Sequence, residues 1–207
     1  MYTPDPFAMA DEQAYALMRR YPFATLISGA GAQLQVSHLP LLVERREGGG
    51  AALIGHMALG NPHWRALEGE AVTVVFQGPH GYISPSWYDE ARAVPTWNYA
   101  AVHATGVARL IREVEPLMAA LERLVQAHEA GFERPWRLDP QDPWTRRLAA
   151  GIVGFEITIA QVQGKAKLSQ NRTPGSQRGV LDALSASADA GDQALAALMA
   201  EVLGLAP

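Results

Sequence analysis

The sequence predicts a mainly β, α+β fold in which an antiparallel barrel carries added helices. Short extended segments separated by glycine-containing turns follow one another along much of the chain, with amphipathic helical segments placed between and after them. No Gly-x-Gly-x-x-Gly pattern follows a predicted strand, and no phosphate-loop lysine motif is present. A parallel nucleotide-binding sheet is therefore not expected.

Strands are expected where β-branched and aromatic residues recur between turn residues. Residues 71–77 give the clearest pattern, and the triple glycine at 48–50 marks the loop of a hairpin. The predicted strands cover residues 24–28, 34–43, 51–57, 71–77, 101–114 and 153–162.

Besides a short helix near Asn61, helices are expected at four places. Residues 11–20 have apolar side chains on one face, and Pro116 suits the first turn of a second helix. A short third helix begins near Pro143, and an amphipathic C-terminal helix ends at Gly204. Residues 185–190 form the most linker-like stretch, and no internal repeat is present.

The composition excludes several classes of protein. The 207 residues include no cysteine, so disulfides, thiolate metal sites and cysteine nucleophiles are impossible. Hydrophobic residues make up 48% and charged residues 18%, which predicts a folded chain with apolar surface covered by a second subunit or a ligand. The net charge of −4 gives no overall attraction to nucleic acid. Because no signal-peptide pattern and no apolar run of about 20 residues occurs, we expect a soluble, cytoplasmic protein without a membrane segment.

The segment Ser37-His38-Leu39-Pro40 is the first candidate binding site. Proline removes a hydrogen-bond donor from a strand, so this strand is expected at a sheet edge or a bulge. Backbone groups left free at such a break are available to a planar heteroaromatic ligand. Packing of His38 at a strand end is the alternative.

The turn after the strand at 51–57 is the second candidate, with His56, Met57 and Asn61 as its binding residues. Asn61 is expected to open a short helix, and free N–H groups at a helix start suit phosphate. His56 and His63 lie seven residues apart without an acidic partner nearby, so no metal site is predicted.

Much of the aromatic block at residues 80–99 is expected to be ordered loop rather than regular sheet, because Pro85 and Pro95 interrupt it. It ends in Trp97-Asn98-Tyr99. Aromatic rings in such a loop stack on a flat ligand, seal an interface or plug a barrel mouth. The residues alone leave these three roles open.

The segment at residues 164–172 is the most specific candidate site. Lys165 and Lys167 are two residues apart on an extended run, so their side chains point the same way. The amide and guanidinium groups that follow suit a phosphate or the edge of an amide-like ring. A solvated basic loop is the alternative. The groups that follow the lysines are Gln170, Asn171 and Arg172.

Seven motifs follow one another in order over nearly the whole chain. They are Met1-Tyr2-Thr3-Pro4 with Phe7, Ser37-His38-Leu39-Pro40, Gly55-His56-Met57-Ala58 with Asn61-Pro62, Val74-Val75-Phe76-Gln77-Gly78-Pro79-His80, Tyr82-Ile83-Ser84-Pro85-Ser86-Trp87-Tyr88, Val94-Pro95-Thr96-Trp97-Asn98-Tyr99 with Val102-His103, and Gly164-Lys165 with Lys167-Leu168-Ser169-Gln170-Asn171-Arg172. Together these motifs resemble the PaiB family, the FMN-binding negative transcriptional regulators of bacteria. One departure is Ala58-Leu59-Gly60, where relatives commonly have Ala-Arg-Ala, so any positive charge from that arginine must come from elsewhere in this chain.

The resemblance implies an antiparallel split β-barrel like that of pyridoxamine phosphate oxidase, forming a homodimer that binds FMN without a covalent link. Residues 1–175 would form the FMN-binding domain with inserted helices, and residues 176–207 a helical extension packed on it. The flavin ring would lie against residues 37–40 under Trp97, Asn98 and Tyr99. The phosphate would lie at residues 56–61 or on Lys165, Lys167 and Arg172.

The resemblance also implies negative transcriptional regulation, with DNA as a partner and with sensing of flavin or redox state. Two alternatives stay open on the same fold. One is a flavin-dependent oxidoreductase that uses FMN and a nicotinamide donor. The other is a haem-binding or haem-degrading protein, with an axial ligand among the histidines. No catalytic residue is predicted. The candidate axial ligands are His38, His56, His80 and His103.

Overall fold

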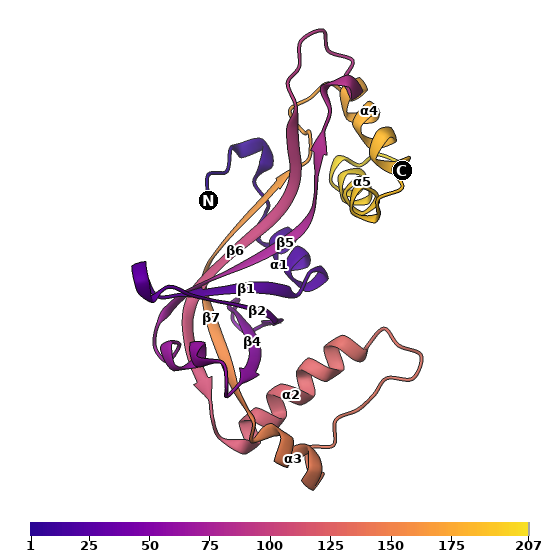
Figure 1. The fold of residues 1–207 in the computed structure, drawn as a ribbon. Coiled ribbons are helices and arrows are strands. Elements are labelled where there is room, and N and C mark those ends of the chain that lie inside the picture. Colours follow the sequence, from indigo (N-terminus) through magenta and orange to yellow (C-terminus); the bar gives the residue numbers. More distant parts are fainter. Residues whose placement is uncertain (207) are drawn as a thin grey trace. The chain divides into compact units, whose positions relative to one another are not determined.

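The computed structural model describes residues 1–206, in which seven strands form one sheet in the order β2-β1-β5-β6-β7-β4-β3 (Figure 1). The strands are β1 (Phe23–Ser28), β2 (Gln35–Pro40), β3 (Leu42–Arg45), β4 (Ala51–Ala58), β5 (Ala71–Ile83), β6 (Thr96–Ile111) and β7 (Ile152–Lys167). The α-helices of the described residues are α1 (Asp11–Arg20), α2 (Val114–Glu129), α3 (Pro143–Ala149), α4 (Pro174–Ser185) and α5 (Ala190–Leu203).

The strand pairs β1–β2, β1–β5, β3–β4 and β4–β7 are all antiparallel. The triple glycine forms the predicted β3–β4 hairpin, in which the Arg46 N–H donates to the Gly50 carbonyl at 2.8 Å. Helices lie before, between and after the strands rather than alternating with them. The predicted mainly β, α+β class is therefore confirmed.

The chain divides into two compact units. The first unit contains residues 1–17, residues 77–102 and the described residues from Gln163 onward. The second unit contains Met18–Phe76 and His103–Val162. The predicted division of the chain between residues 175 and 176 stays a prediction.

The core of the second unit lies on one face of its strands. Leu26, Val74 and Ile157 alternate with more exposed neighbours and are fully buried. Helix α2 adds an apolar stripe, because Ala120 and Leu124 pack against Ile54 of β4. Each large apolar side chain buried in this way contributes about 1.5–3 kcal/mol to folding.

Strand β6 requires a glycine where it approaches β7. A Cβ atom at Gly106 would lie 2.1 Å from the Thr158 carbonyl oxygen, which is backbone and cannot move aside cheaply. Glycine therefore allows the two strands to approach this closely inside the second unit.

Helices α4 and α5 form a pair in the first unit, where they lie side by side (Figure 1). Val180 and Leu184 of α4 and Leu195 and Met199 of α5 are buried. Gly204 ends α5 in the left-handed conformation, with φ of 65°, as the sequence predicts. The predicted amphipathic C-terminal helix is confirmed.

The prediction of one extended run over residues 34–43 is wrong. The run is two strands, β2 and β3, which take the first and the last place in the strand order although they are consecutive in the chain. Leu41 separates them and is buried in the core. Pro40 has no N–H to continue a ladder, so the chain leaves one edge at this point.

Regular structure reaches further into the aromatic block than predicted. β5 continues to Ile83 and β6 begins at Thr96, so the loop covers only residues 84–95.

The sequence analysis did not predict helix α4, although Thr173 carries a signal for it. Its side chain accepts a hydrogen bond from the Ser176 N–H, and Pro174 occupies the first helical position.

Candidate functional site

Ser37 and Asn61 are joined through a buried histidine in the second unit. The His63 ring nitrogens lie 2.8 Å from the Ser37 hydroxyl and 2.9 Å from the Ser28 hydroxyl. The Asn61 amide donates to Ser37 Oγ at 3.1 Å, and its carbonyl oxygen accepts from the His63 N–H at 3.1 Å. Burial lowers the pKa of His63, which favours the neutral ring that two hydroxyls can satisfy. The sequence shows no sign of this network, because it joins three separate segments.

The rest of the first candidate site lies on an edge strand, as Pro40 predicts. His38 is exposed, and its Nδ1 lies 3.1 Å from the Thr25 hydroxyl. The Phe23 ring stacks on the His38 ring at 6.4 Å between centroids. Leu39 is half-buried. Contact of this strand's backbone with a flavin ring stays a prediction.

The second candidate site has few groups free to bind phosphate. Met57 is buried, and burial lowers the pKa of half-buried His56. Asn61 caps a 3-10 helix of five residues, η3 (Pro62–Ala66), and occupies one of its free N–H groups itself. Such a short helix adds little dipole to attract an anion.

Aromatic side chains gather on one face of β5 and β6 in the first unit. Trp97 is 55% exposed and Tyr82 is 48% exposed. The centroid of the Trp97 ring lies 6.3 Å from that of Tyr82 and 6.4 Å from that of His80. We call these three residues the aromatic face. Exposed rings of this size are available to stack on a flat ligand.

Lys165 is a buried cation in the first unit, with 8% of its surface exposed. Its Nζ donates to the Tyr2 carbonyl at 3.1 Å and lies 5.7 Å and 5.2 Å from the ring centroids of Tyr2 and Tyr99. Among residues 1–206, no carboxylate forms an ion pair with it. A buried ammonium group without a counter-ion favours an anionic ligand nearby.

Lys167 lies beside the start of β6. Its Nζ donates to the Thr96 hydroxyl and to the Trp97 carbonyl, both at 2.7 Å. Burial lowers the pKa of Lys167, and the positive charges of Lys165 and Arg172 lower it further. The three cations therefore act on one another, and an added anion would relieve their repulsion.

The turn after β7 is held by its own side chains. The Gln170 amide donates to the Ala166 carbonyl at 2.6 Å, and its oxygen accepts from the Leu168 N–H at 2.7 Å. Ser169 adopts a left-handed conformation with φ of 68°, which is strained for serine. Its hydroxyl accepts a bond from Asn98 at 2.9 Å.

Asn98 and Asn171 differ in their surroundings. Asn98 is buried on the face of β6 opposite Trp97 and Tyr99, because side chains alternate along a strand. Its Oδ1 has no hydrogen-bond partner within residues 1–206. Asn171 is exposed and is available to a ligand.

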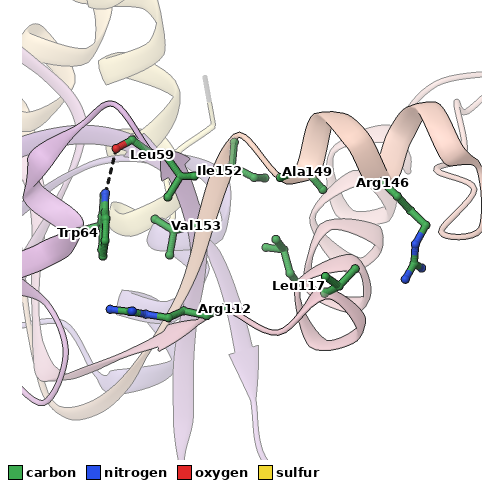
Figure 2. A pocket seen from close by; sticks show the side chains of 10 residues that line it. Leu59, Trp64, Arg112, Leu117, Arg146, Ala149, Ile152 and Val153 are labelled. Atoms are coloured by element: carbon green, nitrogen blue, oxygen red, sulfur yellow. Dashed lines mark hydrogen bonds between the residues drawn. The ribbon is translucent and has the colours of Figure 1, made fainter.

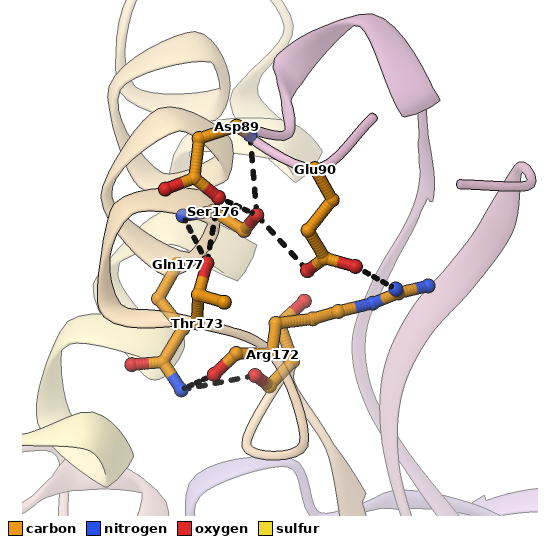
Figure 3. Close-up of polar contacts among 7 residues, drawn as sticks. Asp89, Glu90, Arg172, Thr173, Ser176 and Gln177 are labelled. Carbon is orange, nitrogen blue, oxygen red and sulfur yellow. Dashed lines mark hydrogen bonds and ion pairs between the residues drawn. The ribbon is translucent and has the colours of Figure 1, made fainter. Parts of the chain in front are cut away.

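Arg172 belongs to a polar cluster that the sequence analysis did not find (Figure 3). Its guanidinium donates to Glu90 at 2.8 Å and lies 4.5 Å from the centroid of the Tyr88 ring. Beside it, the Asp89 carboxylate accepts from Thr173 Oγ1 at 2.6 Å and from the buried Ser176 hydroxyl. The cluster joins loop 84–95 to the start of α4.

The predicted site residues thus divide between the two units. The second unit holds those at residues 37–40 and 56–61, and the first holds those at 97–99 and 165–172. Within the first unit, the Lys165 ammonium lies over the Tyr99 ring, and the Lys167 ammonium donates to the backbone carbonyl of Trp97. In the described residues, no group of three or more potential metal ligands occurs, and no helix is long and apolar enough to cross a bilayer.

Comparisons with known proteins give the family. Residues 1–161 match a family model described as "Putative FMN-binding domain". The chain is 34% identical over 206 residues to the "Protease synthase and sporulation protein PAI 2" of Bacillus subtilis (strain 168), and the match covers 98% of both chains. The chain belongs to the PaiB family. It is also 31% identical to an uncharacterized protein of Emericella nidulans, over 80% of this chain and 82% of the other.

Solved structures share the fold of this PaiB family member. The flavocytochrome Anf3 from Azotobacter vinelandii matches with a TM-score of 0.57 and 19% identity, over 77% of this chain and 69% of the other. A FAD and heme binding protein from Mycobacterium smegmatis matches with a TM-score of 0.57 and 18% identity, over 76% and 71%. The predicted antiparallel split β-barrel is confirmed, and FMN is the cofactor of the family to which the chain belongs.

We predict that Asp89 stabilises the fold in a pH-dependent way. Hydrogen bonds from Ser176 and Thr173 hold the pKa of Asp89 below its usual value of 3.8. Its contribution is therefore fully present above that value and is lost as the pH falls through the lowered pKa of the folded state. In urea unfolding at a series of pH values, Asp89→Asn should be less stable than the unmodified protein at pH 7, and the difference should shrink below about pH 4.

The matched control is Asp182→Asn, because Asp182 is exposed on α4, the helix whose start Asp89 contacts. This variant should keep the acid dependence of the unmodified protein. A stability difference for Asp89→Asn that is equally large at pH 3 and pH 7 would contradict the assignment.

Proposed function

We propose that this protein is a homodimeric negative transcriptional regulator that binds FMN without a covalent link. The observation that carries the FMN part is the aromatic face beside two lysines that have no carboxylate partner among residues 1–206. FMN presents a flat ring system at one end and a phosphate at the other, so it needs this combination of rings and cations. When bound, it supplies redox chemistry that the protein's own side chains lack.

The phosphate belongs on Lys165 and Lys167 rather than at residues 56–61. The turn at Asn61 has already used one N–H of a five-residue helix. Arg172 is paired with Glu90, so its charge is largely compensated. Lys165 and Lys167 donate to neutral oxygen atoms, so no carboxylate among residues 1–206 competes with an anion for either ammonium group.

The ring system belongs on the aromatic face. Trp97 and Tyr82 are exposed, and Lys167 fixes the Trp97 backbone through its carbonyl oxygen. Stacking on such rings adds about 0.5–1.5 kcal/mol beyond the buried area. Charge-assisted bonds to the phosphate add about 1.5–3 kcal/mol each.

Loss of the Lys167 charge should weaken FMN binding about 10- to 100-fold, which corresponds to one charge-assisted hydrogen bond. The variant is Lys167→Gln, which keeps a donor for the Trp97 carbonyl and so limits damage to the fold. Flavin fluorescence titration measures the affinity. Arg178→Gln is the control, because Arg178 is exposed and donates to the Ala206 carbonyl.

An affinity unchanged in Lys167→Gln would move the phosphate to residues 56–61. An unmodified protein that takes up no flavin at micromolar FMN would refute cofactor binding altogether.

A second copy of the chain is the proposed cover for the open face of β1 and β2. Phe23 is 67% exposed and Val36 is 51% exposed, and both lie on the face that carries His38. Exposed apolar side chains on neighbouring strands are typical of protein interfaces. This supports the homodimer of the proposal.

A charge placed on this face should therefore separate the subunits. We expect Val36→Glu to sediment as a monomer at concentrations where the unmodified protein sediments as a dimer, because the interface would bury an unpaired carboxylate. Val94→Glu is the control, since Val94 is exposed in loop 84–95. A monomeric unmodified protein, or a Val36→Glu variant that stays dimeric, would contradict the proposed interface.

The regulatory part rests on the motifs shared with the PaiB regulators and on the Bacillus subtilis relative, "Protease synthase and sporulation protein PAI 2", whose match covers both chains almost completely. The regulator should retard a DNA fragment from upstream of its own gene, and the affinity should fall steeply with salt as phosphate contacts release counterions. A shuffled fragment of equal length is the control. Equal retardation of both fragments, or none, would contradict regulation. FMN bleaching by NADH in that case would favour a flavin oxidoreductase.

A further inference from the structure

The second unit contains a pocket of about 260 Å³ between η3, the end of β6 and helices α2 and α3 (Figure 2). Its lining includes Leu59 from the turn at residues 56–61, but none of the side chains predicted individually to bind the cofactor. Its lining is mostly apolar, with two arginines. The lining residues are Leu59, Trp64, Arg112, Val114, Leu117, Arg146, Ala149, Ala150, Ile152 and Val153.

We propose that this pocket binds a small apolar carboxylate, with the hydrocarbon part on the apolar walls and the carboxylate on Arg112. Its volume lies just below the roughly 300–1,000 Å³ of drug-sized ligand pockets, so the ligand has about ten non-hydrogen atoms. The proposal concerns a site separate from FMN and does not rest on the proposed function.

The apolar walls are preformed. The Trp64 indole N–H donates to the Leu59 carbonyl at 3.0 Å, which fixes the orientation of the ring. Leu117 and Ala149 are buried on the opposite side of the pocket (Figure 2). A ligand entering here therefore meets rigid surfaces and loses little free energy to reorganisation of the protein.

Arg112 is the anchor because its charge is uncompensated. Its Cζ lies 5.2 Å from the centroid of the Trp64 ring, and no carboxylate among residues 1–206 forms an ion pair with it. Two carboxylates, Glu68 and Glu113, line a neighbouring pocket that Arg112 also lines, but neither forms an ion pair with Arg112 in the described residues. The Glu68 carboxylate instead accepts a hydrogen bond from the Leu110 N–H at 2.8 Å.

The other arginines near the pocket leave the surroundings positive. Arg146 is paired with Glu115 and donates to the Pro140 carbonyl at 3.0 Å, so it shapes the wall without offering a free charge. Arg65 lies 5.4 Å from the centroid of the Trp64 ring and adds a second uncompensated cation near Arg112. An anion with an apolar tail matches this combination, whereas an amine would be repelled.

Isothermal titration calorimetry with sodium octanoate tests the proposal on the full-length protein, with 1-octanol as the uncharged probe of equal length. We expect octanoate to bind with Kd below about 1 mM and at least about tenfold more tightly than 1-octanol. Arg112→Met should weaken octanoate binding at least about tenfold without changing the FMN affinity. Arg109→Met, an exposed arginine that lies outside this lining, should bind octanoate as the unmodified protein does.

A second variant separates the pocket from a general effect of charge. Ala150 is exposed and lines the pocket, so Ala150→Phe should fill the space and abolish octanoate binding while the fold stays intact. Each of four results would overturn the proposal: no heat from octanoate, equal affinity for 1-octanol, unchanged binding in Arg112→Met, or displacement of octanoate by FMN. The last would assign the pocket to the cofactor.

Discussion

The two-residue alternation of β6 is the constraint on which the rest of the structure depends. For sixteen residues this strand sends one set of side chains into the core and the other set outward. Asn98, Ala100 and Val102 are buried, while Trp97 and Tyr99 face the other way. A shift of one residue in pairing would bury Trp97 and expose Asn98. The proposed flavin contacts thus exist because the core fixes the strand register.

Electrostatic pairing decides which cations are available for an anion. Arg172 stands in the same basic segment as Lys165 and Lys167, yet it is paired with Glu90 from loop 84–95. The lysines instead donate to backbone and hydroxyl oxygens, which do not neutralise them. The same distinction applies to the two arginines of the apolar pocket. Arg112 has no carboxylate partner within residues 1–206, whereas Arg146 is paired with Glu115. Lys165 in the first unit and Arg112 in the second each lie over an aromatic ring.

Polar clusters in this protein join segments that are distant in sequence. His63 connects β1, β2 and η3 through two serine hydroxyls and Asn61. Asp89 and Glu90 connect loop 84–95 to the start of α4 through Ser176. Buried polar groups destabilise a fold unless they are hydrogen-bonded, so each cluster also fixes the arrangement that satisfies it. Their residues lie beside predicted binding residues and hold them in place.

The sequence by itself determined the α+β class, helix α1, the glycine hairpin, the edge position of β2 and the amphipathic C-terminal helix, because these depend on local patterns of apolar residues, glycine and proline. Its motifs also indicated the family and FMN. Only the tertiary structure decided that residues 34–43 are two strands on opposite edges, that Glu90 neutralises Arg172, and that Asn98 is buried away from Trp97. Those outcomes depend on which segments meet in space, and a linear pattern carries no information about the partner that a side chain will find.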